Sequence, residues 1–192
     1  MEKSIGKKNT AIIISGKGSN LRSLIKYSKT KKSLIKIVLV ISNNSNAKGI
    51  QYAKKSKISN IIVKYINKKK FEKRLLKLLK GNKVELICLA GFMKILSADF
   101  IKNVNMPILN IHPSLLPKYK GLNTHYRAIK NNEKYSGATV HIVNKKLDSG
   151  KIILQERVKI LKSDNEENLK SKVLKIEHKI YPKAIIKFLA DH

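Results

Sequence analysis

Asn110, His112 and Asp148 are side chains of types that acyl transfer can use. Asn110 and His112 lie two positions apart in an apolar run, so in a strand they point to the same face. An amide can donate to a developing oxyanion, and an imidazole can donate or shuttle a proton as charge moves. Asp148 lies in a turn-like stretch before Gly150, and a carboxylate beside His112 would raise the pKa of the imidazole above about 6.5. Asn110 and His112 could together stabilise an oxyanion, and Asp148 could form a proton relay with His112 if the fold brings the two side chains together.

The histidines and the acidic turn also have ordinary structural interpretations. A histidine at a strand end is most often a satisfied core or edge residue, and an Asp before Ser-Gly is a common turn former. His141 is interpreted as a residue that supports the site or the fold, His125 as part of a helix start, and His178 as structural. The five histidines show no metal-ligand spacing with Cys88, so no metal is expected.

A second motif, the glycine loop at residues 15–20, reads Ser15-Gly16-Lys17-Gly18-Ser19-Asn20. Its glycines permit a tight turn, and the helix expected after it offers a positive dipole end that suits a phosphate. The alternative is an ordinary turn in which Ser19 or Asn20 caps the helix. The motif lacks the Walker ending and the full dinucleotide fingerprint, so no nucleotide cofactor is expected.

Alternating strands and helices must position these motifs. Apolar, β-branched runs predict strands, and leucines and isoleucines at helical spacing predict helices between them. The strands are expected at residues 11–15, 35–41, 61–63, 86–90, 108–111, 138–143 and 152–158, and the helices at 20–29, 47–56, 71–80 and 165–189, the last interrupted at Pro182. The alternation predicts an α/β fold: a single domain over residues 1–192 with a Rossmann-like, mostly parallel sheet and helices on both faces. Residues 1–9 are expected to be disordered.

The composition limits the classes of partner. The formal net charge is +30, but the only arginines are Arg22, Arg74, Arg127 and Arg157, and the lysines are scattered along the chain. A nucleic-acid site would cluster basic residues with stacking aromatics, so a biased base composition of the genome explains the charge better, and no nucleic-acid partner is expected. No run is long enough to cross a membrane, and the single Cys88 favours a reducing cytoplasm.

The stretch Asn110-Ile111-His112-Pro113-Ser114-Leu115-Leu116-Pro117 resembles the signature of folate-dependent formyltransferases, above all the phosphoribosylglycinamide formyltransferase family. The resemblance covers the chain from Ala11 to about Leu189 and implies the formyltransferase fold. The other stretches that carry it are the glycine loop and its following Leu21, Leu89 to Leu96, Gly137 to His141, Leu147 to Ile153, and Glu177-His178. It implies transfer of a formyl group from 10-formyltetrahydrofolate to the amine of 5'-phosphoribosylglycinamide in de novo purine synthesis.

The resemblance also implies roles for individual residues. The catalytic residues would be Asn110, His112 and Asp148. The phosphoribosylglycinamide substrate would contact Gly18, Ser19, Asn20 and Glu177. The folate would contact Lys68, Met93, Lys94, Ile95, Leu96, Asn110, Asn144, Lys145, Lys146, Leu147 and Asp148. The expected partners are small molecules, with no metal, and a monomer and a dimer both remain open.

Three alternatives use the same features differently. Methionyl-tRNA formyltransferase shares the folate chemistry, but that family carries an additional C-terminal domain and typically has Ala where Pro113 stands. Formyltetrahydrofolate deformylase usually has an additional N-terminal domain and Phe at the position of Leu115. A basic nucleic-acid-binding module on a degenerate transferase fold would explain the charge, but not the intact set of Asn110, His112 and Asp148.

Overall fold

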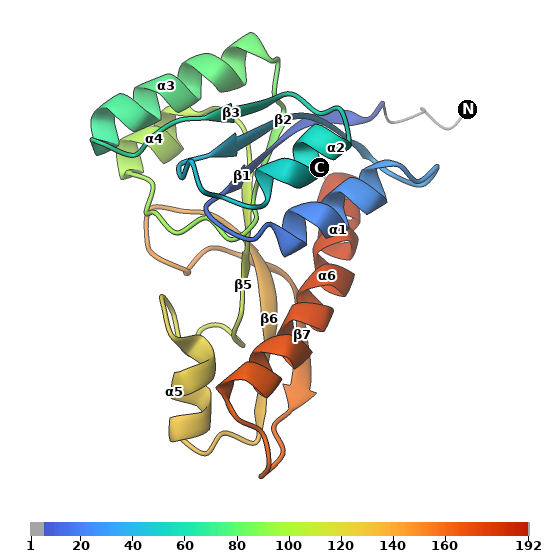
Figure 1. Cartoon of the computed structure of the whole chain (residues 1–192), viewed down its shortest axis with the longest axis vertical. Helices are drawn as coiled ribbons and strands as arrows, with labels where there is room; N and C mark the ends of the chain where they lie inside the picture. Colours follow the sequence, from blue (N-terminus) through green and yellow to red (C-terminus); the bar gives the residue numbers. More distant parts are fainter. Residues whose placement is uncertain (1–5, 192) are drawn as a thin grey trace. The chain divides into compact units, whose positions relative to one another are not determined.

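The computed structural model describes residues 6–191. Backbone contacts divide the chain into a first unit, up to Leu109, and a second unit, from Asn110. The strands and helices of the first unit are β1 (Lys8–Ile14), α1 (Ser19–Ser28), β2 (Ile35–Ser42), α2 (Ile50–Lys55), β3 (Asn60–Ile62), α3 (Lys68–Gly81), β4 (Leu86–Leu89) and α4 (Ala98–Asn103). Strand β5 (Ile108–His112) contains the boundary. The second unit continues with α5 (Thr124–Lys130), β6 (Tyr135–Ile142), β7 (Ile152–Lys159) and α6 (Glu166–Ala190) (Figure 1).

The first unit is a parallel α/β arrangement. Strand β1 pairs with β2 and β4, and β2 pairs with β3, all in parallel. The chain moves outward from β1 to β3 and then returns to β4, so right-handed crossovers place α1 and α2 on the face opposite α3 and α4 (Figure 1). Residues 11–14 of β1 are completely buried, as expected for a strand covered on both faces.

The second unit is built on an antiparallel pair. Strands β6 and β7 pair from Tyr135 opposite Lys159 to His141 opposite Ile152, and α6 packs along both strands. Strand β7 alternates between exposed and partly buried positions, whereas β6 is buried along most of its length. The strand order of the sheet is β3-β2-β1-β4-β5-β6-β7, with the antiparallel β6–β7 pair at one end of this order. The predicted α/β fold with a mostly parallel sheet is confirmed.

Helix α6 corrects one prediction, because Pro182 lies inside it without ending it. The four side chains that flank the proline on the buried face are fully buried: Ile180, Tyr181, Ala184 and Ile185. Burying one large apolar side chain stabilises a fold by about 1.5–3 kcal/mol, whereas a proline inside a helix costs about 3 kcal/mol. Continuing the helix through Pro182 therefore stabilises more than interrupting it.

Other boundaries also differ from the predictions. The predicted disordered segment at residues 1–9 does not extend to Lys8 and Asn9, which begin β1, while its residues 1–5 lie outside the described part. The short helix α4 was not predicted, because a six-residue helix with only Phe100 buried has no visible periodicity. The prediction of a single domain over residues 1–192 stays a prediction. Within the described residues, no helix is both long enough and apolar enough to cross a bilayer.

Candidate active site

The second unit brings the predicted catalytic residues together with His141. His112 Nδ1 lies 3.3 Å from Asp148 Oδ2, and His141 Nε2 lies 3.6 Å from Asp148 Oδ1. Asn110 Nδ2 lies 3.2 Å from His141 Nε2. The two imidazoles and the carboxylate are almost completely buried, with side-chain exposures of 7%, 2% and 9% for His112, His141 and Asp148. These four residues, Asn110, His112, His141 and Asp148, form what we call the acyl-transfer cluster.

Two strands and one turn supply the cluster. The end of β5 carries Asn110 and His112, and β6 carries His141. Asp148 lies in the β6–β7 connection with φ +43°, and its Oδ2 accepts from the Gly121 N–H at 2.9 Å. The turn needs Gly150, because a Cβ there would lie 1.6 Å from the carbonyl oxygen of Ile142. The Asp-Ser-Gly sequence therefore sets the backbone path that delivers the carboxylate.

The His112 ring is flanked by hydrogen-bond acceptors on both nitrogens. Nδ1 faces the Asp148 carboxylate, and Nε2 lies 2.9 Å from the carbonyl oxygen of Tyr119. A carbonyl and a carboxylate can only accept, so a neutral ring donates to one of them at a time and an imidazolium donates to both. The ring is therefore held in one orientation whichever nitrogen carries the proton.

Burial lowers the pKa of the His112 imidazole below its ordinary value, although the Tyr119 carbonyl and the Asp148 charge act in the opposite direction. The expectation of a raised pKa is therefore wrong: the removal of water from the ring outweighs the carboxylate beside it. Burial alone would raise the pKa of the Asp148 carboxyl, but hydrogen bonds from His141 and from the Gly121 N–H, together with the positive charge of His112, hold that pKa below its ordinary value. Asp148 is ionised at neutral pH.

The Asn110 amide is oriented by His141. His141 Nδ1 lies 3.0 Å from the Ile142 carbonyl oxygen, which can only accept, so Nδ1 carries a hydrogen. When the ring is neutral, Nε2 accepts one N–H of the Asn110 amide at 3.2 Å, whereas in the imidazolium Nε2 donates to Asp148 Oδ1 instead. The second N–H of that amide can donate to a ligand. His141 thus contacts a predicted catalytic residue, and its role in the site or in the fold stays a prediction.

The first unit contains the glycine loop. Gly18 has φ +74° and caps α1 with no side-chain hydrogen bond, so the alternative of Ser19 or Asn20 as the cap is wrong. A Cβ on Gly18 would lie 2.5 Å from the Cα of Gly49, so the loop packs backbone against backbone. The first turn of α1 has no acidic residue, which leaves its positive end without a counter-charge on the helix. These features suit an anionic group.

Hydrogen bonds to Ser15 hold the start of the glycine loop in place. Ser15 Oγ donates to Asn43 Oδ1 at 2.6 Å and accepts from the Met93 N–H at 2.8 Å. Asn44 Nδ2 donates to the Ser15 carbonyl oxygen at 3.1 Å. The second of these bonds ties the loop to the segment after β4, where folate contacts were predicted.

The predicted binding residues lie in both units. In the first unit Lys68 begins α3 and is exposed. Met93 and Ile95 are 65% and 61% exposed, whereas Leu96 is buried. Lys94 Nζ lies 4.9 Å from the centre of the Tyr65 ring. In the second unit residues 144–147 form the exposed part of the β6–β7 connection, where Asn144 Oδ1 accepts from the Lys146 N–H. Glu177 lies in α6 and is 6% exposed.

The sequence did not reveal the main-chain groups of the site or the hydrogen bonds that hold the loop after His112. The Tyr119 carbonyl and the Gly121 N–H have no side-chain signature, so only coordinates reveal them. Thr139 Oγ1 donates to the Ser114 carbonyl, accepts from the Leu116 N–H and accepts from Gln155 Nε2. The signal for Thr139 was present, because it lies within the resembling stretch Gly137 to His141.

Comparison with known proteins identifies the family. A family model described as "Formyl transferase" matches residues 8–185. The chain belongs to the formyl transferase family. The family match includes both the glycine loop and the acyl-transfer cluster. Within the described residues, no group of three or more His, Cys, Asp or Glu side chains is arranged to hold a metal ion.

Relatives within the formyl transferase family are similar along nearly the whole chain. Phosphoribosylglycinamide formyltransferase of Haemophilus influenzae is 40% identical over 96% of this chain and 88% of its own length. A crystal structure of phosphoribosylglycinamide formyltransferase from Brucella melitensis has a TM-score of 0.90 and 40% identity, covering 95% of each chain. The trifunctional purine biosynthetic protein adenosine-3 of Drosophila melanogaster is 41% identical over 93% of this chain, which spans only 14% of that relative's length.

Proposed function

We propose that this formyl transferase moves the formyl group of 10-formyltetrahydrofolate to the amine of 5'-phosphoribosylglycinamide, a step of de novo purine synthesis. The observation that carries the proposal is the convergence of Asn110, His112 and Asp148 in one buried cluster. Full-length relatives named phosphoribosylglycinamide formyltransferase, 37% and 40% identical, support the choice of acceptor.

The chemistry proceeds by direct attack on the formyl carbon. As the acceptor amine forms its bond to that carbon, the formyl oxygen becomes an oxyanion, to which Asn110 donates its second N–H. One such donor is worth roughly 3–4 kcal/mol of transition-state stabilisation. His112 adds positive charge when protonated, with ionised Asp148 beside it to stabilise the imidazolium. Through an intervening water, the His112–Asp148 pair relays the proton lost by the amine to the folate nitrogen as the bond from that nitrogen to carbon breaks.

The binding residues are assigned by the same proposal. The glycine loop, through Gly18, Ser19 and Asn20, takes the phosphate of the acceptor, because its backbone turn and uncapped helix end suit an anion. Glu177 contacts the glycinamide part. The folate is assigned to Lys68 and residues 93–96 of the first unit, where exposed Met93 and Ile95 offer apolar surface to an aromatic ring, and to residues 144–148 of the second unit.

The proposal requires no metal and no nucleotide cofactor, since the oxyanion is met by an amide and an imidazole. The substrates are small molecules, and we expect the enzyme to act in the cytoplasm. The charge of +30 would steer anionic substrates toward the protein without a nucleic-acid partner.

The acceptor is tested by supplying purified protein with 10-formyltetrahydrofolate and one candidate acceptor at a time. We expect formyl transfer with phosphoribosylglycinamide, detected as the formylated product by mass spectrometry. Equal folate consumption without any acceptor would identify a deformylase, and transfer to methionyl-tRNA would identify the tRNA enzyme. Steeply salt-dependent DNA binding with no turnover would favour a nucleic-acid module. Each of these last three outcomes contradicts the proposal.

A further inference from the structure

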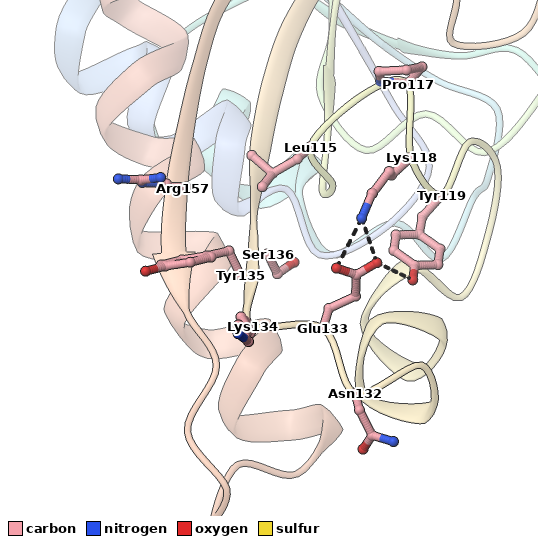
Figure 2. Close-up of a pocket in the computed structure, with 10 residues that line it drawn as sticks. All are labelled: Leu115, Pro117, Lys118, Tyr119, Asn132, Glu133, Lys134, Tyr135, Ser136 and Arg157. Atoms are coloured by element: carbon pink, nitrogen blue, oxygen red, sulfur yellow. Dashed lines mark hydrogen bonds and ion pairs between the residues drawn. The ribbon is translucent and has the colours of Figure 1, made fainter.

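A hydrogen-bonded group lies beside a pocket of about 600 Å³ in the second unit. Figure 2 shows the side chains of Lys118 and Tyr119 pointing toward the carboxylate of Glu133. The Tyr119 hydroxyl donates to Glu133 Oε1 at 2.9 Å, and Lys118 Nζ donates to the same oxygen at 2.8 Å. Asn131 Nδ2 donates to the Tyr119 hydroxyl at 3.0 Å, and the Arg127 guanidinium lies 5.0 Å from the centre of the Tyr119 ring. Glu133, Asn131 and Arg127 thus hold the Tyr119 side chain, and Lys118 holds the Glu133 carboxylate.

The backbone of Tyr119 explains why such anchoring is needed. Its φ is +56°, in the left-handed region that side chains other than glycine rarely adopt. A residue held there is strained, and the strained conformation persists only where several surrounding contacts hold it in place. In this conformation the Tyr119 carbonyl oxygen lies 2.9 Å from His112 Nε2. The anchored side chain and the carbonyl at the catalytic imidazole therefore belong to one strained residue.

We propose that Tyr119 is a positioning residue for His112, whose side-chain anchors Glu133, Asn131 and Arg127 hold its main-chain carbonyl against the imidazole Nε2. The carbonyl orients the ring from the side opposite Asp148. It also favours the imidazolium, because that form alone donates to both flanking acceptors at once. Nothing in the chemistry of formyl transfer requires the Tyr119 side chain to touch a substrate.

Several charged groups around His112 favour or disfavour its protonated form, and the Tyr119 carbonyl acts together with them. Asp148, from the β6–β7 connection, favours the charged ring. His141 on β6 and Arg127 on α5 disfavour it, as does burial. With these three groups unchanged, loss of the Tyr119 carbonyl leaves the carboxylate as the sole protein acceptor for the ring. The pKa of His112 then falls further, and a smaller fraction of the enzyme is protonated at neutral pH.

Tyr119→Phe tests this coupling, with Tyr135→Phe as the matched control. Tyr135 lines the same pocket, but its ring lies against Arg157. We expect Tyr119→Phe to lower the His112 pKa followed by NMR and to lower kcat by about 3–10-fold, with KM within twofold, since a tenfold loss of the protonated form corresponds to one pH unit. Tyr135→Phe should change neither quantity. A lower melting temperature with an unchanged His112 titration would overturn the proposal.

Glu133 supplies a second and independent test. Glu133→Gln keeps an oxygen that accepts from the Tyr119 hydroxyl, whereas Glu133→Ala removes it. We expect Glu133→Ala to reproduce the NMR shift and the loss in kcat, and Glu133→Gln to restore at least half of each. Equal behaviour of the two variants would show that the anchor does not act through this hydrogen bond. The kcat readout rests on the proposed function, but the NMR titration does not, so a failure of the assigned reaction leaves the positioning role testable.

Discussion

The two functional regions of this formyl transferase are built from different parts of the chain. In the second unit, the acyl-transfer cluster consists of buried side chains that hydrogen-bond to one another and to main-chain groups. In the first unit, the glycine loop consists mainly of backbone, with an uncapped helix end and a glycine packed against another glycine. The function of the acyl-transfer cluster depends on the functional groups that its side chains carry. The function of the glycine loop depends on the absence of side-chain atoms at its glycines.

This difference predicts opposite sensitivities. Exchanging one atom in the acyl-transfer cluster should remove the chemistry and leave the fold intact. Adding a few atoms to the glycine loop should damage binding, because there is no room for them. The predictions below use matched substitutions to separate these effects.

Asp148→Asn and His112→Ala should have the largest effect. Asp148→Asn keeps the shape of the side chain but removes the negative charge beside His112, and His112→Ala removes the proton carrier. Loss of a positioned acid–base group or its charge partner typically costs about 10²–10⁴ in rate, so we expect kcat to fall by that factor in each variant. Steady-state assays with phosphoribosylglycinamide measure it.

Asp164→Asn provides the control for a lost carboxylate in the same unit. Asp164 pairs with Lys172 at 2.6 Å and accepts from the Leu161 N–H at 2.9 Å, and neither partner belongs to the acyl-transfer cluster. Its replacement should cost some stability and leave kcat within twofold. If Asp148→Asn turned over at the wild-type rate, the acyl-transfer cluster would not perform the reaction.

Gly18→Val should have the next largest effect, on binding. Its Cβ would lie 2.5 Å from the Cα of Gly49, and the position has a positive φ, so the loop must move. We expect the Kd for phosphoribosylglycinamide to rise by about tenfold or more, with a smaller change for the folate, as measured by calorimetric titration of each ligand. Ser19→Ala should also raise the Kd for phosphoribosylglycinamide more than the Kd for the folate, but by a smaller factor.

Gly81→Ala is the matched control for Gly18→Val. Gly81 is the last residue of α3, and a Cβ there meets nothing within 4 Å. A glycine replaced by alanine at a compatible position stabilises by about 0.4–1 kcal/mol, so Gly81→Ala should raise the stability slightly and leave both affinities unchanged. Equal weakening of both ligands by Gly18→Val would contradict the assignment of the loop to the phosphate.

The sequence predicts the fold and the cluster well for identifiable physical reasons. Buried parallel strands are continuous apolar runs, so β1, β2 and β4 are visible in the sequence. Asn110 and His112 share a strand face by simple period-two geometry, whereas the assignment of Asp148 to the same site came from the family resemblance, because the Asp-Ser-Gly pattern alone indicates only a turn.

Properties that depend on several groups at once were not predictable. The lowered pKa of His112 results from burial by residues distant in the sequence, which outweighs the one carboxylate that the sequence reveals. The acceptor on Nε2 is the main chain of Tyr119, a residue whose type does not encode it. The continuity of α6 through Pro182 depends on packing that a local helix rule does not contain.

A buried imidazole outside the acyl-transfer cluster gives the smallest and most specific prediction. Among the described residues, His125 Nδ1 is buried without a hydrogen-bond partner, in contrast to the two engaged nitrogens of His112. Burial and the nearby positive charges of Lys170 and His112 lower the pKa of His125 to about 4. Between about pH 6.5 and pH 4 the unfolded chain therefore binds more protons at this residue than the folded chain, so stability must fall as the pH falls.

His125→Phe should make that loss of stability shallower. One group contributes at most about 1.4 kcal/mol per pH unit within this window, and the contribution ends below pH 4, where both states are protonated. Urea unfolding at pH 7, 5.5 and 4.5 measures the slope, with Tyr126→Phe on the same helix as a control that should keep the wild-type slope. His112 has a lowered pKa of its own, so part of the slope should survive in His125→Phe. An unchanged slope would mean that His125 finds a partner in solution, and the contrast between an engaged and an unengaged imidazole would no longer hold.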